Sequence, residues 1–589
     1  MSNRKRVILI MRYHIIEPLG MLYLAGVAKK LGWEAKVILV KNFDFESVFR
    51  EAISFKPDIV GFSIWTGYHI QTFAACDKIL AMGIPVVIGG PHATFATEQC
   101  ALHATWVVKG EGFRNFRRIL EGELEPGVHF DDIRMAEGFP KPDRKLVYDD
   151  YPELGENPIK SIVASVGCPF KCSYCYAPHY NNMYGGFELN LRPIGEIVAE
   201  ALAIKENWPV QMIYFQDDIF GFNMPWLRQF VKKWSELVKI PWHCQIRLEL
   251  TRDTERLELF REGGCTGITL AIESGNEFLR QFVLLRPMAD ELIVEGIRKI
   301  QRLGFSLRTE QILSVPFSGI KTDIQTLELN NRLGPEMAWT SILSPYGGTN
   351  MGAIAKQFLF FDKDNDALND TFFNRSVLHH SRDGIVSVQP TVSKLMKDRF
   401  DNPLLRMEAR KNGDFKADVY LKNLNNSSPI CALEYLSVEE NERYCDQTVV
   451  LQRLFDWLSH VPNGSRLATK IVNLRKDEWS WKRIGRMTEE HLESEGYKDR
   501  MPEWRQKLAD EMHCLPDKLP KGVDENPYYF CFFPSSGEFA KKFLKDGFFN
   551  IPGFWEQLSF AGREVRYWLY SRALYKLEIA KPPIAKIQN

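Results

Sequence analysis

Residues 165–175 have the sequence Ser-Val-Gly-Cys-Pro-Phe-Lys-Cys-Ser-Tyr-Cys and begin at the end of a predicted strand, 161–166. Their three cysteines, Cys168, Cys172 and Cys175, have the spacing CxxxCxxC, on a loop short enough to point all three sulfurs inward. This geometry suits a metal site. Three thiolates can hold three irons of a [4Fe-4S] cluster and leave the fourth iron open to a non-protein ligand.

Two other interpretations of these cysteines stay open. Zinc prefers four closed ligands, usually from two CxxC or CxxH pairs, and the chain contains no second CxxC pair. A zinc site completed by His179, or three unrelated buried cysteines, are the alternatives, although free cysteines seldom cluster in this way. The other eight of the eleven cysteines are scattered singly, which argues against a disulfide framework. They are Cys76, Cys100, Cys244, Cys265, Cys431, Cys445, Cys514 and Cys531.

The cysteine loop lies within a repeated alternation of strands and helices. Strands are predicted over 161–166, 212–216, 243–248, 267–272, 307–315 and 339–344, with helical stretches between them. Six such units predict an open, partial β/α barrel over 158–350. Its active site is expected at the carboxyl ends of the strands, as in complete barrels.

A separate α/β alternation precedes the barrel. Strands predicted over 7–11, 36–40, 58–63, 85–88 and 106–109, with helices between them, indicate a Rossmann-like, doubly wound parallel sheet over 1–125. Glycine and polar residues collect after the strand ends, at 12–20, 63–68, 89–92 and 110–112, and such sheets bind ligands beyond the carboxyl ends of their strands. One edge is therefore a predicted cofactor face. No GxGxxG or Walker A sequence supports a dinucleotide or ATP there.

The remaining segments differ in composition. Residues 126–157 are rich in proline and charge without clear periodicity, which is typical of a linker. From 351 to 589 the strand–helix alternation stops. Aromatic and charged residues with helical spacing, for example at 449–461 and 501–512, predict a mainly α-helical C-terminal domain there. We expect this domain to close over the substrate and exclude water.

Length and charge restrict the function classes. A chain of 589 residues is longer than a single hydrophobic core usually serves, so several domains are expected. Lys plus Arg and Asp plus Glu each number 75, so no excess charge favours a nucleic acid or a membrane surface. No apolar stretch reaches the about 18 residues of a membrane span, and the run at 7–11 is too short for a signal-peptide core. We therefore expect a cytoplasmic protein.

The cysteine loop, with the aromatic Tyr174 before its third cysteine, resembles the signature of radical S-adenosylmethionine (SAM) enzymes. The resemblance extends over 158–350 through four further stretches: FQDDIFGFN at 215–223, CQIRLELT at 244–251, AIESGNEFLR at 271–280 and LELNNRLGPEMAWTSILSPYGGT at 327–349. Two loops depart from the family pattern. The glycine-rich turn after the fifth strand is SVPFSG at 314–319, and the usual Pro-Gly-Thr is Gly-Gly-Thr at 347–349.

The resemblance implies that the open iron binds the amino and carboxylate groups of SAM. One electron then splits SAM into methionine and a 5′-deoxyadenosyl radical, which requires a reductant such as flavodoxin or ferredoxin. The implied SAM-binding residues lie in the cysteine loop and at the ends of the second to fourth strands: Tyr174, Gln216, Asp217, Arg247, Glu273 and Ser274. For each polar residue, a structural ion pair or a solvated loop is the alternative.

Placed directly before such a barrel, the N-terminal module resembles the cobalamin-binding domain of the family's cobalamin-dependent class, including PLGMLYLA at 18–25. The implied cobalamin contacts follow the third, fourth and fifth strands: Ser63, Trp65, Thr66, Gly67, Tyr68, Gly89, Gly90, Pro91, His92, Gly110 and Glu111. The motif DxHxxG, which places a histidine under cobalt, is absent. We therefore expect a lower cobalt face without a histidine ligand, and His14 and His92 are minor candidates for contact with the corrin. A generic flavodoxin-like domain is the alternative.

Several functions fit this combination. The resemblance favours a methyltransferase that moves a methyl group from methylcobalamin to an unactivated carbon of a natural product, lipid or peptide. A carbon without acidity offers no proton to a general base, so a radical route is needed. An oxidative cyclisation or ring rearrangement needs the same cofactors. A non-catalytic cobalamin-binding regulator and a methylthiotransferase acting on tRNA are further alternatives, and the balanced charge weighs against RNA. No catalytic side chain is predicted.

Overall fold

The computed structural model of the protein describes residues 4–13, 17–41, 43–398, 402–424, 428–475, 478–479 and 481–497. These residues form two compact units. Unit 1 takes its described residues from Met1–Phe170, Tyr176–Asp218 and Lys363–Asp370. Unit 2 takes its described residues from Lys171–Cys175, Ile219–Asp362 and Thr371–Asn589.

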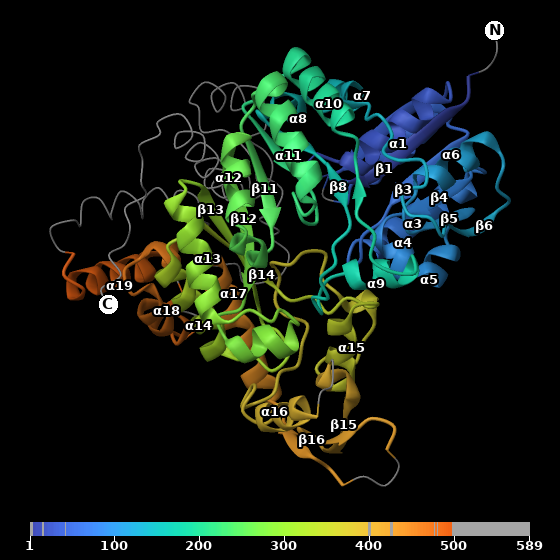
Figure 1. The fold of residues 1–589 in the computed structure, drawn as a ribbon. Coiled ribbons are helices and arrows are strands. Elements are labelled where there is room, and N and C mark those ends of the chain that lie inside the picture. The colour runs from blue at the N-terminus through green and yellow to red at the C-terminus, as the bar shows by residue number, and fades with distance from the viewer. Residues whose placement is uncertain are drawn as a thin grey trace. The chain divides into compact units, whose positions relative to one another are not determined.

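The N-terminal strands of unit 1 form a six-stranded parallel sheet with the order β2-β1-β3-β4-β5-β6 (Figure 1). The strands are β1 (Arg6–Arg12), β2 (Glu34–Val40), β3 (Ile59–Ser63), β4 (Val86–Gly89), β5 (Trp106–Lys109) and β6 (Gly127–Phe130). The five predicted strands are confirmed, and β6 is an addition. Because the strand order reverses at β1, the carboxyl ends of β1 and β3 border the type of crevice in which doubly wound sheets bind ligands.

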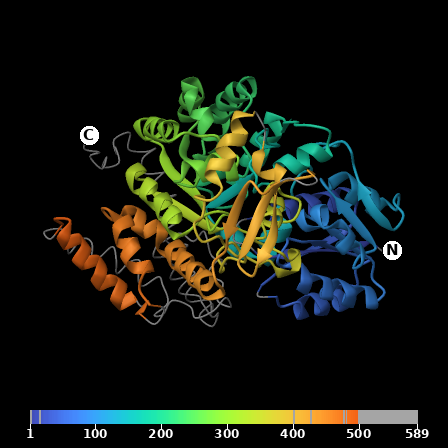
Figure 2. The same cartoon turned by 90° about the horizontal axis from the view of Figure 1, so that it is seen from below.

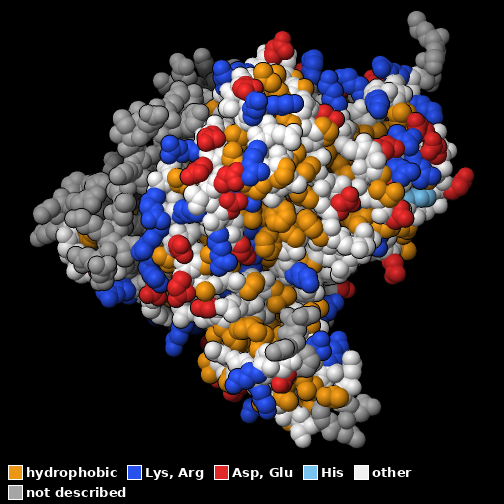
Figure 3. Space-filling view, viewed as in Figure 1, with side chains coloured by type: hydrophobic (Ala, Val, Ile, Leu, Met, Phe, Trp, Pro, Cys, Tyr) orange, Lys and Arg blue, Asp and Glu red, His pale blue; other side chains and the backbone are white. Residues whose placement is uncertain are grey.

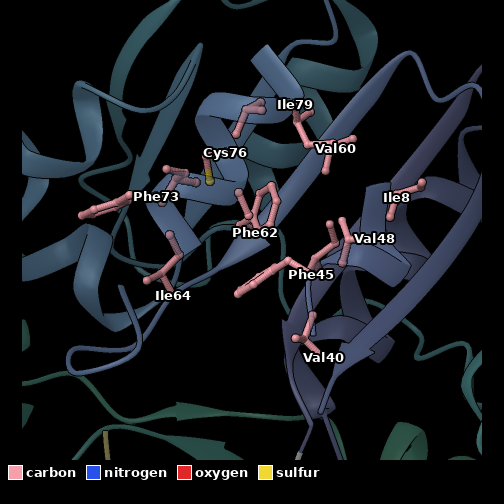
Figure 4. Packing of buried hydrophobic residues seen from close by; sticks show 14 of the residues in the cluster. Ile8, Val40, Phe45, Val48, Val60, Phe62, Ile64, Phe73, Cys76 and Ile79 are labelled. Carbon is pink, nitrogen blue, oxygen red and sulfur yellow. The ribbon is translucent and has the colours of Figure 1, made fainter. Parts of the chain in front are cut away.

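Helices connect the strands of this sheet and pack against it. They are α1 (Leu19–Lys30), α2 (Glu46–Phe55), α3 (His69–Ala81), α4 (Pro91–Phe95), α5 (Thr97–Ala101) and α6 (Phe113–Glu121). Figure 4 shows part of the core, in which Ile8 and Val60 from the strands belong to one cluster with Val48 of α2 and Ile79 of α3. The middle of β1 is buried without alternation, as expected for a parallel strand covered on both faces.

Residues 126–157 differ from the predicted linker, because they contain β6, α7 (Arg144–Asp150) and α8 (Pro152–Glu156). The buried guanidinium of Arg144 donates hydrogen bonds to the carboxylates of Glu17 (2.7 Å) and Glu200 (2.6 Å). These partners lie 127 and 56 residues away in the sequence. A charged segment that finds such partners can be buried, and its local composition does not reveal them.

The six predicted strands of the barrel are present, two in unit 1 and four in unit 2. In unit 1, β7 (Ile159–Ile162) pairs in parallel with β10 (Met212–Phe215). In unit 2, four parallel strands pair in chain order: β11 (Trp242–Ile246), β12 (Cys265–Glu273), β13 (Ser306–Leu313) and β14 (Met337–Ile342). Helices follow these strands: α10 (Ile194–Asn207), α11 (Met224–Lys233), α12 (Thr254–Glu262), α13 (Asp290–Arg302) and α14 (Ile320–Leu333). The partial β/α barrel is therefore confirmed.

One predicted strand is interrupted. The expected strand over 161–166 divides, because β7 ends at Ile162 and β8 (Ser165–Val166) pairs antiparallel with β9 (Asn190–Leu191). The cysteine loop therefore begins from a short two-stranded ribbon and not directly from the barrel strand.

After the barrel, unit 2 continues with helices and a small sheet (Figure 2). The helices are α15 (Asn350–Gln357), α16 (Gln389–Lys397), α17 (Val438–His460), α18 (Gly464–Val472) and α19 (Trp481–Ser494). The helix predicted over 449–461 lies almost entirely within α17, whereas the one predicted over 501–512, with Cys514 and Cys531, lies outside the described residues. The antiparallel strands β15 (Met407–Gly413), β16 (Lys416–Leu421) and β17 (Cys431–Glu434) were not predicted. β15 is largely polar, and β16 and β17 have only six and four residues, so the hydrophobic alternation of a strand is weak or short.

No helix in the described part of the chain combines the length and apolar character that crossing a membrane requires. On the face seen in Figure 3, basic and acidic side chains are interspersed. This pattern agrees with the equal numbers of acidic and basic residues, 75 each.

A buried carboxyl joins α17 to the barrel. Asp323, in the first turn of α14, accepts hydrogen bonds from the hydroxyl of Tyr444 in α17 (2.9 Å) and from the N–H of Ser314 after β13 (3.3 Å). Ser314 has a φ of 58°, a conformation that glycine adopts more easily, in the loop that departs from a glycine-rich turn. Burial raises the pKa of Asp323 to about 7.

Asp323→Asn should remove a pH dependence of stability. An unfolded aspartate ionises near pH 4, whereas Asp323 in the folded protein stays protonated up to about pH 7. Between these values the unfolded state has lost the proton and the folded state has not, so Asp323 lowers the stability of the wild type as the pH rises. We expect the melting temperature of D323N, relative to wild type, to be higher at pH 8 than at pH 4.5 by at least about 2 °C in scanning calorimetry. A difference independent of pH would contradict this.

Candidate functional site

The first part of the cysteine loop is held by side chains of unit 1. The carboxylate of Asp218, after β10, accepts a hydrogen bond from the N–H of Gly167 (2.9 Å). The amide of Asn181, in α9 (Ala177–Met183), donates to the carbonyl of Cys168 (2.9 Å). Both contacts involve the backbone, so they set the path of the chain at the first cysteine.

Asp217, a predicted SAM contact, also holds the backbone before the loop. Its carboxylate accepts hydrogen bonds from the N–H of Ala164 (2.8 Å) and the hydroxyl of Ser165 (2.5 Å). Burial raises the pKa of Asp217 to about 7. The neighbouring Gln216 donates its amide to the hydroxyl of Ser161 (3.3 Å). A contact of Asp217 with SAM would therefore compete with bonds that shape the loop.

Two guanidinium groups in unit 2 approach the sulfur of Cys172. Arg247, which follows β11, donates to Sγ at 2.9 Å, and Arg286 donates to the same atom at 3.8 Å. Arg247 also pairs with the carboxylate of Glu249 (3.1 Å). Cys172 is buried, with 7% of its surface exposed. Its sulfur therefore lies in a positively charged, largely dry environment, which suits a metal-binding thiolate.

Tyr174 and Glu273, two further predicted SAM contacts, meet at Arg286. The hydroxyl of Tyr174 donates to the carboxylate of Glu273 and accepts from Nη1 of Arg286 (3.0 Å). Arg286 also lies 3.4 Å from the Glu273 carboxylate. Burial raises the pKa values of Tyr174 and Glu273. The structure thus brings Tyr174, Arg247 and Glu273 together around one cluster cysteine.

The backbone at Glu273 leaves the regular strand. The pairing of β12 with β13 shifts register between Ala271 and Glu273, and Glu273 has a φ of 69°. Bulges and positive φ angles in residues other than glycine cost energy and concentrate at functional sites. The predicted Ser274 follows, and its hydroxyl accepts the N–H of Asn276 (3.2 Å). This strained turn supports a functional role for Glu273.

The donor chemistry of the loop fits an iron–sulfur cluster. The loop supplies three cysteine sulfurs, that of Cys168 in unit 1 and those of Cys172 and Cys175 in unit 2. Charged hydrogen bonds to a ligating sulfur, such as those to Cys172, are a usual feature of such clusters. Among the described side chains, no group of three or more His, Cys, Asp and Glu is arranged to hold a metal. Ligation by all three sulfurs therefore stays a prediction.

Arg247→Ala should make the reconstituted cluster harder to reduce. Removing a cationic donor from the Cys172 sulfur favours the oxidised cluster, which carries less negative charge. We expect a negative shift of the midpoint potential of about 59 mV, a tenfold change for a one-electron couple, in an EPR-monitored redox titration. The control is Arg228→Ala, because Arg228 pairs with Glu255 on the surface of unit 2. Equal potentials for R247A and wild type would refute this role.

Three glycines at the carboxyl edge of the first sheet occupy positions where a side chain would collide. A Cβ on Gly90 (φ 95°) would lie 2.9 Å from a backbone nitrogen of the loop after β3. A Cβ on Gly67 (φ 91°) would meet the backbone of the segment Lys363–Asp370. A Cβ on Gly110 (φ 80°) would meet the hydroxyl of Tyr184. All three belong to loops that follow adjacent strands, so close backbone packing shapes this edge.

A chain of hydrogen-bonded side chains crosses the same edge. Thr66 Oγ1 lies 2.9 Å from His92 Nδ1, and His92 Nε2 lies 3.2 Å from Gln99 Oε1. Asp366 accepts from the amide of Gln99 (2.8 Å) and pairs with Nε2 of His69 (2.8 Å). Burial lowers the pKa of His92 to about 3, so its ring is neutral at ordinary pH. With both ring nitrogens engaged, His92 supports the edge through hydrogen bonds.

The remaining predicted cobalamin residues flank this edge. The guanidinium carbon of Arg12 lies 5.2 Å from the ring centroid of Tyr68. The N–H of Glu111 donates to the hydroxyl of Tyr184 (2.7 Å), and burial raises the pKa of the Glu111 carboxyl to about 7. His14 lies outside the described residues. Four others are found at the ends of β3 and β4 and in the segments that follow them: Ser63, Trp65, Gly89 and Pro91.

Four residues that shape the site were not predicted: Asp218, Asn181, Tyr184 and Arg286. Asp218 is adjacent to the predicted Asp217, so the acidic pair at a strand end was a usable signal. Asn181 lies 13 positions after Cys168, whereas Tyr184 is 73 positions from Glu111 and Arg286 is 114 positions from Cys172. No local sequence pattern predicts such contacts.

Comparisons with known families identify both α/β parts of the chain. Residues 5–120 match the B12 binding domain, and residues 162–318 match the Radical SAM superfamily. The chain therefore combines a B12 binding domain with a radical SAM domain. Its cofactors are accordingly cobalamin, SAM and a [4Fe-4S] cluster.

Known relatives of this chain have low sequence identity to it. An uncharacterized methyltransferase of Pyrococcus horikoshii is 24% identical over 372 residues, which are 58% of this chain and 79% of that protein. An anaerobic magnesium-protoporphyrin IX monomethyl ester cyclase of Rubrivivax gelatinosus is 24% identical over 370 residues, 56% of this chain and 64% of that protein. The solved structure of the cobalamin-dependent radical SAM enzyme OxsB shares the fold, with 12% identity, a TM-score of 0.51 and coverage of 98% of this chain and 79% of OxsB.

Gly110→Ala should weaken cobalamin binding, because the added Cβ collides with the hydroxyl of Tyr184 at a φ of 80°. Gly122→Ala is the matched control. Gly122 has a φ of 76°, and no atom of the described residues lies within 4 Å of its Cβ position. Both variants carry similar backbone strain of about 1 kcal/mol, so their difference reports the collision.

We expect the dissociation constant of hydroxocobalamin to rise at least about tenfold in G110A, equivalent to about 1.4 kcal/mol, and to stay within about twofold in G122A. Equilibrium dialysis measures both values. Wild-type affinity in G110A would exclude the loop after β5 from the cobalamin site.

Proposed function

We propose that this enzyme transfers a methyl group from SAM, by way of cobalamin, to an unactivated carbon of a natural product, lipid or peptide. The observation that carries the proposal is the presence of a B12 binding domain and a three-cysteine radical SAM loop in one chain. When bound, cobalamin supplies a methyl carrier, and the cluster with SAM supplies a hydrogen-abstracting radical. A carbon without an acidic hydrogen requires both. The methyltransferase from Pyrococcus horikoshii supports this choice.

The chain's own residues then have distinct roles. Cys168, Cys172 and Cys175 ligate the cluster, and Arg247 places positive charge at Cys172. Nη1 of Arg286 lies 3.0 Å from the hydroxyl of Tyr174 and 3.4 Å from the carboxylate of Glu273, and so orients these two side chains to contact SAM. Gln216 and Ser274 are further SAM contacts in this proposal. The loops after β3, β4 and β5 hold cobalamin.

The proposal extends to the surroundings of the reaction. The described residues from 351 onward belong to a domain that closes over the substrate and keeps water from the radical. A cytoplasmic one-electron reductant, such as flavodoxin or ferredoxin, supplies two electrons per turnover. The balanced charge, 75 basic and 75 acidic residues, supports a small-molecule or peptide substrate over a nucleic acid.

Labelled SAM tests the proposal. The anaerobically purified protein, loaded with cluster and hydroxocobalamin, is incubated with methyl-deuterated SAM, a reductant and small-molecule extracts, and the products are analysed by mass spectrometry. We expect one deuterated methyl product, one S-adenosylhomocysteine and one 5′-deoxyadenosine per turnover. Cys172→Ala should abolish 5′-deoxyadenosine formation. Cys431→Ala, which removes a half-buried thiol of β17, should retain it.

The second candidate is an oxidative cyclisation or ring rearrangement, which the relationship to the Rubrivivax gelatinosus cyclase favours. It predicts 5′-deoxyadenosine without S-adenosylhomocysteine, and a product that carries no deuterium from SAM. That result would reject methyl transfer and retain the radical chemistry. Absence of 5′-deoxyadenosine from the fully loaded protein under all these conditions would instead favour a non-catalytic regulator.

A further inference from the structure

The short helix α9 follows the cysteine loop and is held by a few specific contacts. It begins two residues after Cys175, and none of its seven residues is buried. A helix without a buried apolar face gains little from hydrophobic packing, so its position depends on individual side-chain contacts. Among the places that these contacts reach, two in unit 1 belong to predicted cofactor-binding segments.

The first place is the predicted cobalamin edge. Tyr184, directly after α9, accepts the N–H of Glu111 through its hydroxyl (2.7 Å), and this hydroxyl occupies the space beside Gly110. At the other end of α9, the ring of Tyr176 stacks on Phe95 of α4, with 3.8 Å between centroids and an interplanar angle of 8°. α9 is thus attached to the segments after both β4 and β5.

The second place is the first cysteine. Asn181, in the middle of α9, donates its amide to the carbonyl of Cys168 (2.9 Å). Asn181 and Tyr184 are three residues apart, and residues at this spacing are neighbours on one side of a helix. One side of α9 therefore contacts the backbone of a predicted cluster ligand and the backbone of a predicted cobalamin loop.

We propose that α9 couples assembly of the iron–sulfur cluster to binding of cobalamin, with Asn181 and Tyr184 as positioning residues. Ligation fixes the backbone at Cys168, and the Asn181 amide then fixes α9. Tyr184 in turn holds the turn at Gly110 and Glu111 in the conformation that leaves room for the corrin. Without the cluster, this turn must be ordered when cobalamin binds, which lowers the affinity.

Thermodynamic linkage makes the coupling measurable from either side, because each cofactor must favour the other by the same factor. The experiment determines the dissociation constant of hydroxocobalamin for the full chain, before and after anaerobic reconstitution of the cluster. We expect the wild type to bind at least about fivefold more tightly after reconstitution. Tyr184→Phe and Asn181→Ala should each reduce this ratio to near one.

Tyr151→Phe is the matched control. The hydroxyl of Tyr151 accepts the backbone N–H of Leu39 at 2.7 Å, the same type of bond at the same length as that of Tyr184, and it does not involve α9. Y151F should keep the wild-type ratio. As a second readout, cobalamin should slow the loss of cluster iron to a chelator in the wild type and in Y151F, and should not do so in Y184F.

Several results would overturn the proposal. They are equal cobalamin affinities for cluster-free and cluster-loaded wild type, or a full wild-type ratio in both Y184F and N181A. Two variants at different contacts guard against a folding defect in one of them. Because cobalamin affinity is measured without turnover, a failure of methyl transfer would leave this result unaffected.

Discussion

The hydrogen bond from Arg247 to the sulfur of Cys172 depends on a complete set of buried charge partners. A buried guanidinium without a partner costs several kcal/mol, so the two arginines near this sulfur need their own acceptors. Glu249 serves Arg247, and Glu273 with Tyr174 serves Arg286. These partners come from the ends of β11 and β12 and from the cysteine loop itself. The positive environment of the Cys172 sulfur therefore depends on the positions at which β11 and β12 end.

Acidic side chains near the strand ends have two different uses in this protein. Glu273 lies on a strained turn and contacts the side chains of Tyr174 and Arg286. This position suits contact with a ligand. Asp217 and Asp218 accept hydrogen bonds from the backbone N–H groups of Ala164 and Gly167 and thereby set the start of the cysteine loop. Asp217 and Asp218 differ from Glu273 because they accept hydrogen bonds from buried backbone N–H groups, which would be costly to leave unpaired. A carboxylate near a strand end can thus serve the scaffold as readily as the ligand.

The cofactor edge of the first sheet is completed by a distant segment. Asp366 and Asp370 follow the barrel in the sequence, yet Asp366 pairs with His69 (2.8 Å) and Asp370 with Arg12 (3.0 Å). The close approach at Gly67 brings the same segment against the loop after β3. The strand order reverses at β1, the place where doubly wound sheets bind ligands, and this later segment supplies carboxylate partners to Arg12 and His69 near the ends of β1 and β3. The N-terminal residues alone do not make the edge.

The sequence by itself determined what short-range physics controls. Runs of β-branched residues predicted the barrel strands and five of the six N-terminal strands, and a strand pattern needs only a few neighbours to be recognised. The spacing of Cys168, Cys172 and Cys175 indicated the cluster, and the glycines at 67, 90 and 110 marked tight turns that have positive φ angles. The tertiary structure alone decided which charges are buried and with which partners. The elements within 126–157, the backbone contacts of Asp217 and the approach of Arg286 to Cys172 depend on residues that lie tens to more than a hundred positions away. Whether a charged side chain is buried, and with which partner it pairs, depends on residues that are close in space. The local sequence pattern does not identify those residues.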